Sequence, residues 1–105
     1  MAQSPTVELF YFEGCPNYQT ARELVEEVAA ATGAEFDLRL VEVRSPEEAE
    51  RLRFLGSPTV RVNGHDVEPH ADERTAFVLA CRVYRNGARP SGQPAEEWIR
   101  EALST

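Results

Sequence analysis

The chain has 105 residues, of which 42% are hydrophobic and 28% are charged, and this balance fits one globular domain with one core. Its formal net charge of −7 argues against a nucleic-acid backbone or an anionic membrane surface as a partner, since both attract basic proteins. No stretch approaches the roughly 20 apolar residues of a membrane span, and residues 1–5 lack the basic start of a signal peptide. We therefore expect a cytoplasmic protein, in which two cysteines are more often free or redox-active than joined in a structural disulfide.

The first third of the chain has the pattern of a strand, a helix and a second strand. Residues 6–12 are rich in β-branched and aromatic residues, which predicts an interior strand. A helix is predicted to open at Cys15-Pro16, with Pro16 at the first helical position, and to end at Gly33. Residues 35–43 alternate between apolar and polar, which indicates a second strand at a sheet edge. This order predicts parallel pairing through a right-handed crossover.

The middle of the chain predicts a short helix and a hairpin. Ser45-Pro46-Glu47-Glu48 is typical of a capped helix start, and this helix is predicted to stop at Gly56. Residues 57–62 predict a third strand that begins with a proline. Asn63-Gly64 is a strong two-residue hairpin signal, so residues 65–68 are predicted to return antiparallel to the third strand.

The stretch from residue 69 to residue 93 is interpreted as a long, partly irregular insertion that packs over the domain. Within it, residues 75–83 are apolar enough for a strand or a short helix, whereas residues 86–92 indicate loop. A last helix is predicted from Pro94 onward. We therefore expect a single α/β domain over residues 1–105, with a mixed four-stranded sheet and helices on both faces.

Two motifs resemble those of the thioredoxin-like superfamily. The first is a strand followed by Gly14-Cys15-Pro16 and a helix, and the second is Gly56-Ser57-Pro58-Thr59-Val60 at the start of a strand. The compact start of the chain is similar to the glutaredoxin-like minimal form of that superfamily. Residues 72–75 and 81–84 also resemble segments of small bacterial thioredoxin-like proteins, some of them encountered alongside organomercurial lyases.

The resemblance implies a thioredoxin-like fold and a role for each matching residue. Cys15 takes the position of the nucleophile, and Pro58 that of a cis-proline lying beside it. Ser57 is then the residue whose backbone groups pair with an extended thiol substrate, and Pro16 and Tyr18 complete the predicted substrate side. Dithiol members carry Cys-x-x-Cys, but here Tyr18 replaces the second cysteine and cannot resolve a mixed disulfide.

The position of Cys15 favours a thiolate on physical grounds, because unpaired N–H groups and the positive end of a helix dipole lie at a helix start. Glu13 works against this effect. The other thiol, Cys81, has two open interpretations. If the insertion folds back over the first helix, Cys81 is close enough to pair with Cys15; otherwise it is a buried thiol within the apolar run 76–83.

Several polar and aromatic residues are interpreted as structural. The spacing of Tyr18 favours a core position over contact with the thiolate. His65 and His70 are predicted to lie on the surface, and Arg74 and Arg82 to be solvated charges, with stabilisation of a thiolate or binding of an anionic substrate such as glutathione as the alternative.

The leading hypothesis is a thiol–disulfide redox protein without metal or cofactor, acting on a thiol or disulfide of a protein or a small molecule. Cys15 is its nucleophile, Pro58 its substrate-facing wall, and Cys81 or an external thiol releases the mixed disulfide. One alternative is a binding module in which both cysteines hold a soft metal ion, such as mercury, or an organometal. Another is a redox-silent interaction scaffold in which Cys15 is only a packing residue.

Overall fold

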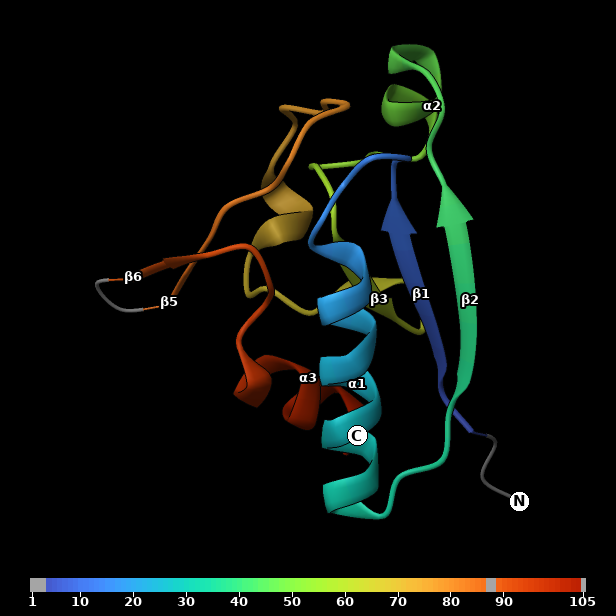
Figure 1. The fold of residues 1–105 in the computed structure, drawn as a ribbon, viewed down its shortest axis with the longest axis vertical. Coiled ribbons are helices and arrows are strands. Elements are labelled where there is room, and N and C mark those ends of the chain that lie inside the picture. The colour runs from blue at the N-terminus through green and yellow to red at the C-terminus, as the bar shows by residue number, and fades with distance from the viewer. Residues whose placement is uncertain (1–3, 87–88, 105) are drawn as a thin grey trace.

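The computed structural model describes residues 4–86 and 89–104. Its centre is a four-stranded sheet with the strand order β2-β1-β3-β4 (Figure 1). The strands are β1 (Thr6–Tyr11), β2 (Asp37–Glu42), β3 (Thr59–Val62) and β4 (His65–Asp66). β2 pairs with β1 in parallel, whereas β3 pairs antiparallel with both β1 and β4. The expected mixed sheet is confirmed, and β2 lies at its edge as predicted.

The helices are α1 (Tyr18–Thr32), α2 (Pro46–Arg51) and α3 (Glu96–Leu103), together with a short 3₁₀ turn, η1 (Ala71–Glu73). The Ser45 side chain caps α2 as predicted, accepting a hydrogen bond from Glu48 N at 3.1 Å. Helix α2 nevertheless ends before the Gly56 stop, because Arg53 takes a φ of 56°. The guanidinium of Arg61 donates to the carbonyls of Leu52 and Arg53 there, at 2.8 and 2.9 Å.

The start of α1 differs from the prediction. Cys15 N donates to Phe12 O at 3.2 Å, which closes a turn at the end of β1. The first helical bond runs from Ala21 N to Asn17 O at 3.0 Å, so α1 begins at Tyr18. The expectation that Pro16 holds the first helical position is therefore wrong, and Cys15 lies in the turn that precedes the helix.

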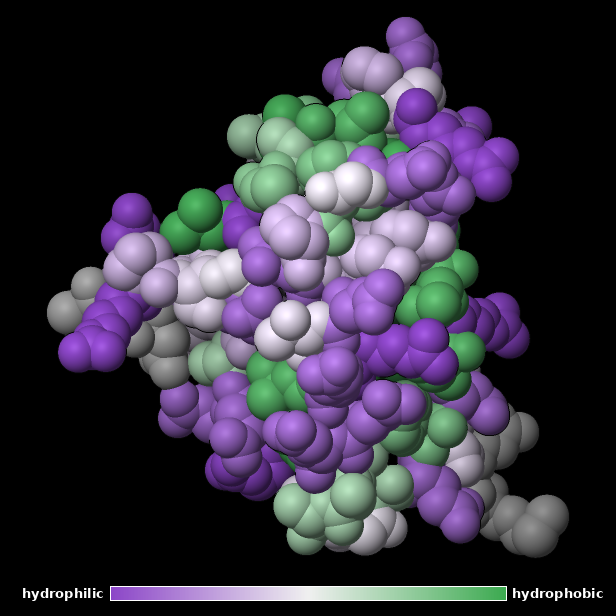
Figure 2. Space-filling view, viewed as in Figure 1, coloured by the Kyte–Doolittle hydropathy of each residue, from purple (hydrophilic) through white to green (hydrophobic). Residues whose placement is uncertain are grey.

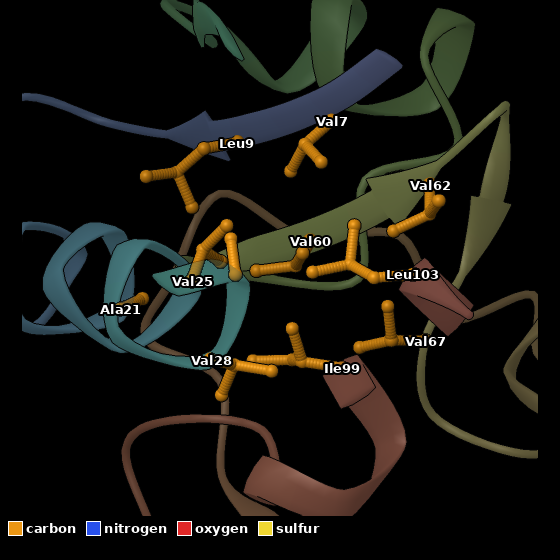
Figure 3. Close-up of a cluster of buried hydrophobic side chains, with 11 residues drawn as sticks. Val7, Leu9, Ala21, Val25, Val28, Val60, Val62, Val67, Ile99 and Leu103 are labelled. Atoms are coloured by element: carbon orange, nitrogen blue, oxygen red, sulfur yellow. The ribbon is translucent and has the colours of Figure 1, made fainter. Parts of the chain in front are cut away.

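Helices cover both faces of the sheet. On one face α1 and α3 pack against β1 and β3, through a cluster that includes Val7, Leu9, Val25, Val28, Val60, Val62, Ile99 and Leu103 (Figure 3). Successive strand residues point to opposite faces, so Phe10 lies on the other side from Leu9. There it packs with Val43, Ala49 of α2 and Phe54. The turn that carries Cys15 follows β1, the strand that both clusters share.

The insertion at residues 69–93 is more regular than expected near its end. Strands β5 (Tyr84–Asn86) and β6 (Arg89–Ser91) pair antiparallel, so the loop prediction is wrong for residues 86 and 89–91, while its residues 87 and 88 lie outside the described part of the chain. Residues 75–83 form neither a strand nor a helix, apart from one isolated bridge. Among the described residues, none of the helices has both the length and the apolar character needed to cross a bilayer.

Candidate thiol site

Cys15 is a buried free thiol at the join of β1 and α1. Its residue surface is only 4% exposed. Gly14 before it has a φ of 95°, a conformation that favours glycine, and this lets the chain turn sharply away from the sheet. Gly92 also approaches this helix start, since a Cβ placed on it would lie 2.5 Å from Asn17 Nδ2. The end of the insertion therefore packs over the region of the thiol.

Cys81 lies in an extended segment that we call the strap (residues 77–84). The strap runs alongside residues 54–58, and Val78 N donates to Phe54 O at 2.9 Å. Ser57 N donates to Ala80 O at 2.8 Å, and Ser57 O accepts from the residue after Cys81 at 2.9 Å. These two bonds form a parallel bridge between Ser57 and Cys81. Cys81 therefore lies beside Ser57, the residue that precedes Pro58 in the chain.

Gly56 allows the strap to approach this closely. A Cβ on Gly56 would lie 2.9 Å from Arg82 Cβ and 3.1 Å from Ala80 O, and its φ is +118°. Both the contact and the backbone conformation therefore require glycine.

The two thiols interact across this bridge. The pKa of Cys81 is raised, first by partial desolvation and then by the negative charge of Cys15 and a hydrogen bond between the two side chains. Cys81 is exposed whereas Cys15 is buried. The interpretation of Cys81 as a buried core thiol is therefore wrong, because the strap lies on the surface of the residue 54–58 segment and leaves Cys81 exposed.

Arg82 anchors the strap through a buried ion-pair network. Its Nη1 donates to Asp66 Oδ2 at 2.8 Å and to Thr59 Oγ1 at 2.9 Å, and its Nη2 donates to Glu68 Oε1 at 2.6 Å. Its side chain is only 1% exposed. Desolvation lowers the pKa of Arg82, but Tyr84 and the two carboxylates outweigh it and raise that pKa. The prediction of Arg82 as a solvated surface charge is wrong, since the hairpin supplies two carboxylates for it.

Tyr84, the last residue of the strap, is its second side-chain anchor. Its hydroxyl donates to Pro58 O at 2.5 Å, and its ring lies 4.3 Å from the Arg82 guanidinium carbon. Burial strongly raises the pKa of Tyr84, so this hydroxyl stays protonated and remains a donor. The Ser57–Pro58 bond is cis, as expected. Ser57 is fully buried, and its Oγ has no hydrogen-bond partner among the described residues.

Pro16 and Tyr18 follow Cys15 where the chain enters α1. Pro16 is exposed, and the half-buried Tyr18 stacks on Tyr11 with ring centroids 4.3 Å apart. Tyr18 also packs against the α1–α3 core, in agreement with its predicted structural role. A hollow of about 310 Å³ opens beside these rings, lined by Tyr11, Glu13, Gly14, Tyr18 and Glu42.

The surface around the strap is apolar. Val78 and Val83 are 45% and 56% exposed. Figure 2 shows hydrophobic side chains gathered near the top of the view, over the loop that joins η1 to β5. His65 and His70 are exposed, as predicted. Within residues 4–86 and 89–104, no group of three or more His, Cys, Asp and Glu side chains is arranged to hold a metal ion.

Sequence reasoning missed the anchors Arg82 and Tyr84. One signal for them was present: Asp66 and Glu68 are two residues apart in the hairpin, a spacing that puts both carboxylates on one side of an extended chain. Two carboxylates on a partly buried face require a cation. A scan against protein-family models finds no match to the chain, and a search of curated proteins finds no significant relative.

Proposed function

We propose that this chain is a thioredoxin-like thiol–disulfide redox protein whose working couple is Cys15 and Cys81. One observation carries the proposal: Cys81, held beside Ser57 by the bridge, lies close enough to Cys15 for a hydrogen bond between the two side chains, and these are the only two cysteines of the chain. The missing second cysteine of the Cys15 turn is then replaced by a thiol that lies far away in the sequence.

The geometry supports reversible disulfide chemistry in three ways. Both cysteines are free thiols, so either can form or break a bond. One of them is exposed to partners, while the other is protected from them. The strap carrying the exposed thiol is held by backbone bonds to Ser57 and by the Arg82 and Tyr84 anchors, so the pair stays together without regular secondary structure.

The reaction would be an exchange of two electrons between this couple and an external disulfide. The Cys15 thiolate acts as the nucleophile that closes the bond to Cys81. The external disulfide accepts the two electrons and leaves as two thiols, while the protein becomes the Cys15–Cys81 disulfide. A low-molecular-weight or protein thiol reverses the reaction.

The test is the thiol count of the full chain after equilibration in buffers of oxidised and reduced glutathione. We expect the wild-type protein to lose both titratable thiols together, with recovery of both after treatment with dithiothreitol. The matched controls are Cys15→Ser and Cys81→Ser, which keep the shape of each side chain with a smaller oxygen in place of sulfur and cannot form the bond. A wild-type protein that keeps two free thiols in oxidising buffer would contradict the proposal.

A second function is favoured by the same contact. Thiolates select soft metal ions, and two of them suffice for an ion that accepts linear coordination, such as mercury(II). Titration of the reduced protein with mercury(II), followed through ultraviolet charge-transfer absorbance, tests it. One equivalent bound by wild type and lost in both serine variants would support binding, while equal binding by either variant would exclude a shared site.

A further inference from the structure

We propose that Cys81, and not Cys15, is the sulfur through which the couple exchanges with low-molecular-weight thiols and disulfides, and that the mixed disulfide forms on Cys81. This inference rests on the proposed redox function and adds the order of its steps. It reverses the order that the sequence suggests, in which Cys15 meets the external partner first.

Cys81 is more accessible to an external sulfur than Cys15. Thiol–disulfide exchange requires the attacking sulfur to approach along the line of the bond that breaks, so a shielded sulfur reacts slowly. Cys15 is 4% exposed beneath the turn after β1, whereas Cys81 is exposed on the strap. An external sulfur therefore reaches Cys81 without any rearrangement of the described structure.

The leaving group also favours attack on Cys81. In exchange, the sulfur with the lower thiol pKa leaves faster. Partial desolvation and the interaction with Cys15 raise the pKa of Cys81, so Cys81 leaves more slowly than an ordinary cysteine. An external thiolate that attacks Cys81 Sγ keeps this sulfur bonded, whereas attack on Cys15 would have to expel it.

The backbone beside Cys81 favours a small substrate over an extended polypeptide. An extended polypeptide would be expected to pair with the backbone of Ser57. Both Ser57 N and Ser57 O are already bonded to the strap, at 2.8 and 2.9 Å. Arg82 and Tyr84 hold the strap in that position. A small thiol or disulfide needs only the exposed sulfur of Cys81, so low-molecular-weight partners fit this site best.

Reduction of the Cys15–Cys81 disulfide takes two exchange steps. An external thiolate bonds to Cys81 Sγ and breaks the Cys15–Cys81 bond, leaving Cys15 as a thiolate. A second external thiolate attacks the external sulfur of the mixed disulfide, releases Cys81 as a thiolate that takes a proton from water, and leaves as a disulfide. Two small thiols are oxidised and the protein disulfide is reduced. The reverse sequence reduces a small disulfide, with Cys15 attacking Cys81 Sγ in the closing step.

The experiment uses bis(2-hydroxyethyl) disulfide, a neutral probe whose approach does not depend on the charge of the protein. The rate at which one mercaptoethanol group is added is measured by mass spectrometry for Cys15→Ser, which keeps Cys81, and for Cys81→Ser, which keeps Cys15. Each rate is measured from about pH 6 to about pH 10, and the plateau at high pH is the rate of the fully ionised thiolate. Comparing the plateau rates separates the accessibility of each sulfur from the pKa of its thiol. We expect the plateau rate of Cys15→Ser to be at least about tenfold higher than that of Cys81→Ser.

A second measurement guards against a loosened strap in Cys81→Ser. The oxidised wild-type protein is mixed with 2-mercaptoethanol, quenched in acid during the reaction and digested. The adduct should lie on the peptide that contains Cys81. An adduct on the Cys15 peptide would overturn the inference while leaving the redox couple intact. If the redox couple itself does not form, the wild-type protein will still have two free thiols after equilibration with oxidised glutathione.

Discussion

The two thiols of this protein are positioned by two different kinds of structure. Cys15 sits between β1 and α1, where the sheet and the apolar face of the helix fix the turn. Cys81 sits in the strap, which has a single bridge and no regular element until β5 begins at Tyr84. The position of Cys81 depends on Arg82, on Tyr84 and on the close approach of the strap to Gly56. The difference shows that two thiols can be held close together when only one of them is positioned by regular elements and side-chain anchors position the other.

Arg82→Ala should produce the largest effect, because it removes the anchor of the strap and leaves Asp66 and Glu68 without their shared cation. We expect a loss of about 3 kcal/mol in the free energy of unfolding. Formation of the Cys15–Cys81 disulfide should slow in parallel. Urea denaturation followed by circular dichroism measures the first, and thiol titration the second.

Arg100→Ala is the matched control for that variant. Arg100 pairs with Glu96 at 2.8 Å on α3, with both side chains more than half exposed. We expect a loss of no more than about 0.5 kcal/mol, because exposed ion pairs contribute little. Equal losses for the two arginine variants would mean that the buried network does not anchor the strap.

Gly56→Ala tests the close approach of the strap to the chain beneath it. The new Cβ would collide with Arg82 Cβ and add backbone strain, so we expect a loss of about 2 kcal/mol and slower disulfide formation. Gly64→Ala is the control, since its φ is +88° but nothing lies within 4 Å of its Cβ position. Gly64→Ala should lose about 1 kcal/mol in the free energy of unfolding from backbone strain alone, and its rate of disulfide formation should not change. Equal rates in the two variants would contradict the role of the contact.

Tyr84→Phe removes the hydrogen bond to Pro58 O and should cost about 1 to 2 kcal/mol near neutral pH. The cost should shrink in alkali. The raised pKa of Tyr84 means that the unfolded chain ionises from about pH 10 while the folded protein keeps the proton, so wild-type stability falls as pH rises above that value.

Urea titrations of wild type and Tyr84→Phe at about pH 9 and about pH 11 check this dependence. The stability difference between the two proteins should be smaller at the higher pH. A difference that grows with pH would mean that the folded state favours the ionised phenol, against the burial described here.

Ser57→Ala should produce the smallest effect. Its Oγ is buried without a partner among the described residues, so its removal should leave stability unchanged or raise it by up to about 1 kcal/mol. The rate of disulfide formation should not change, because Ser57 holds the strap through its backbone. Thr59→Val is the control, since that hydroxyl donates to Gly56 O at 2.7 Å and accepts from Arg82. It should lose about 1 kcal/mol or more; a larger loss in Ser57→Ala would reveal an undescribed partner of Ser57 Oγ.

The sequence by itself determined the frame of the molecule. The alternation of residues 35–43, the Ser45 cap, the Gly33 helix end and the Asn63-Gly64 turn are local signals, and each corresponds to an observed element or boundary. Such signals act over a few residues, so they can be read without knowing the rest of the fold. The position of Cys15 after the first strand followed in the same way from the β-branched and aromatic residues 6–12 and from Gly14.

Only the tertiary structure decided where Cys81 lies. Residues 75–83 are apolar without a period, so no local rule assigns them to a strand or a helix. Their course depends on the backbone of Ser57 and on two carboxylates in the hairpin, which are distant in sequence from the groups that they bind. Long-range bonds of this kind select one conformation from many that the local sequence allows, because a buried charge or peptide group must find its partner.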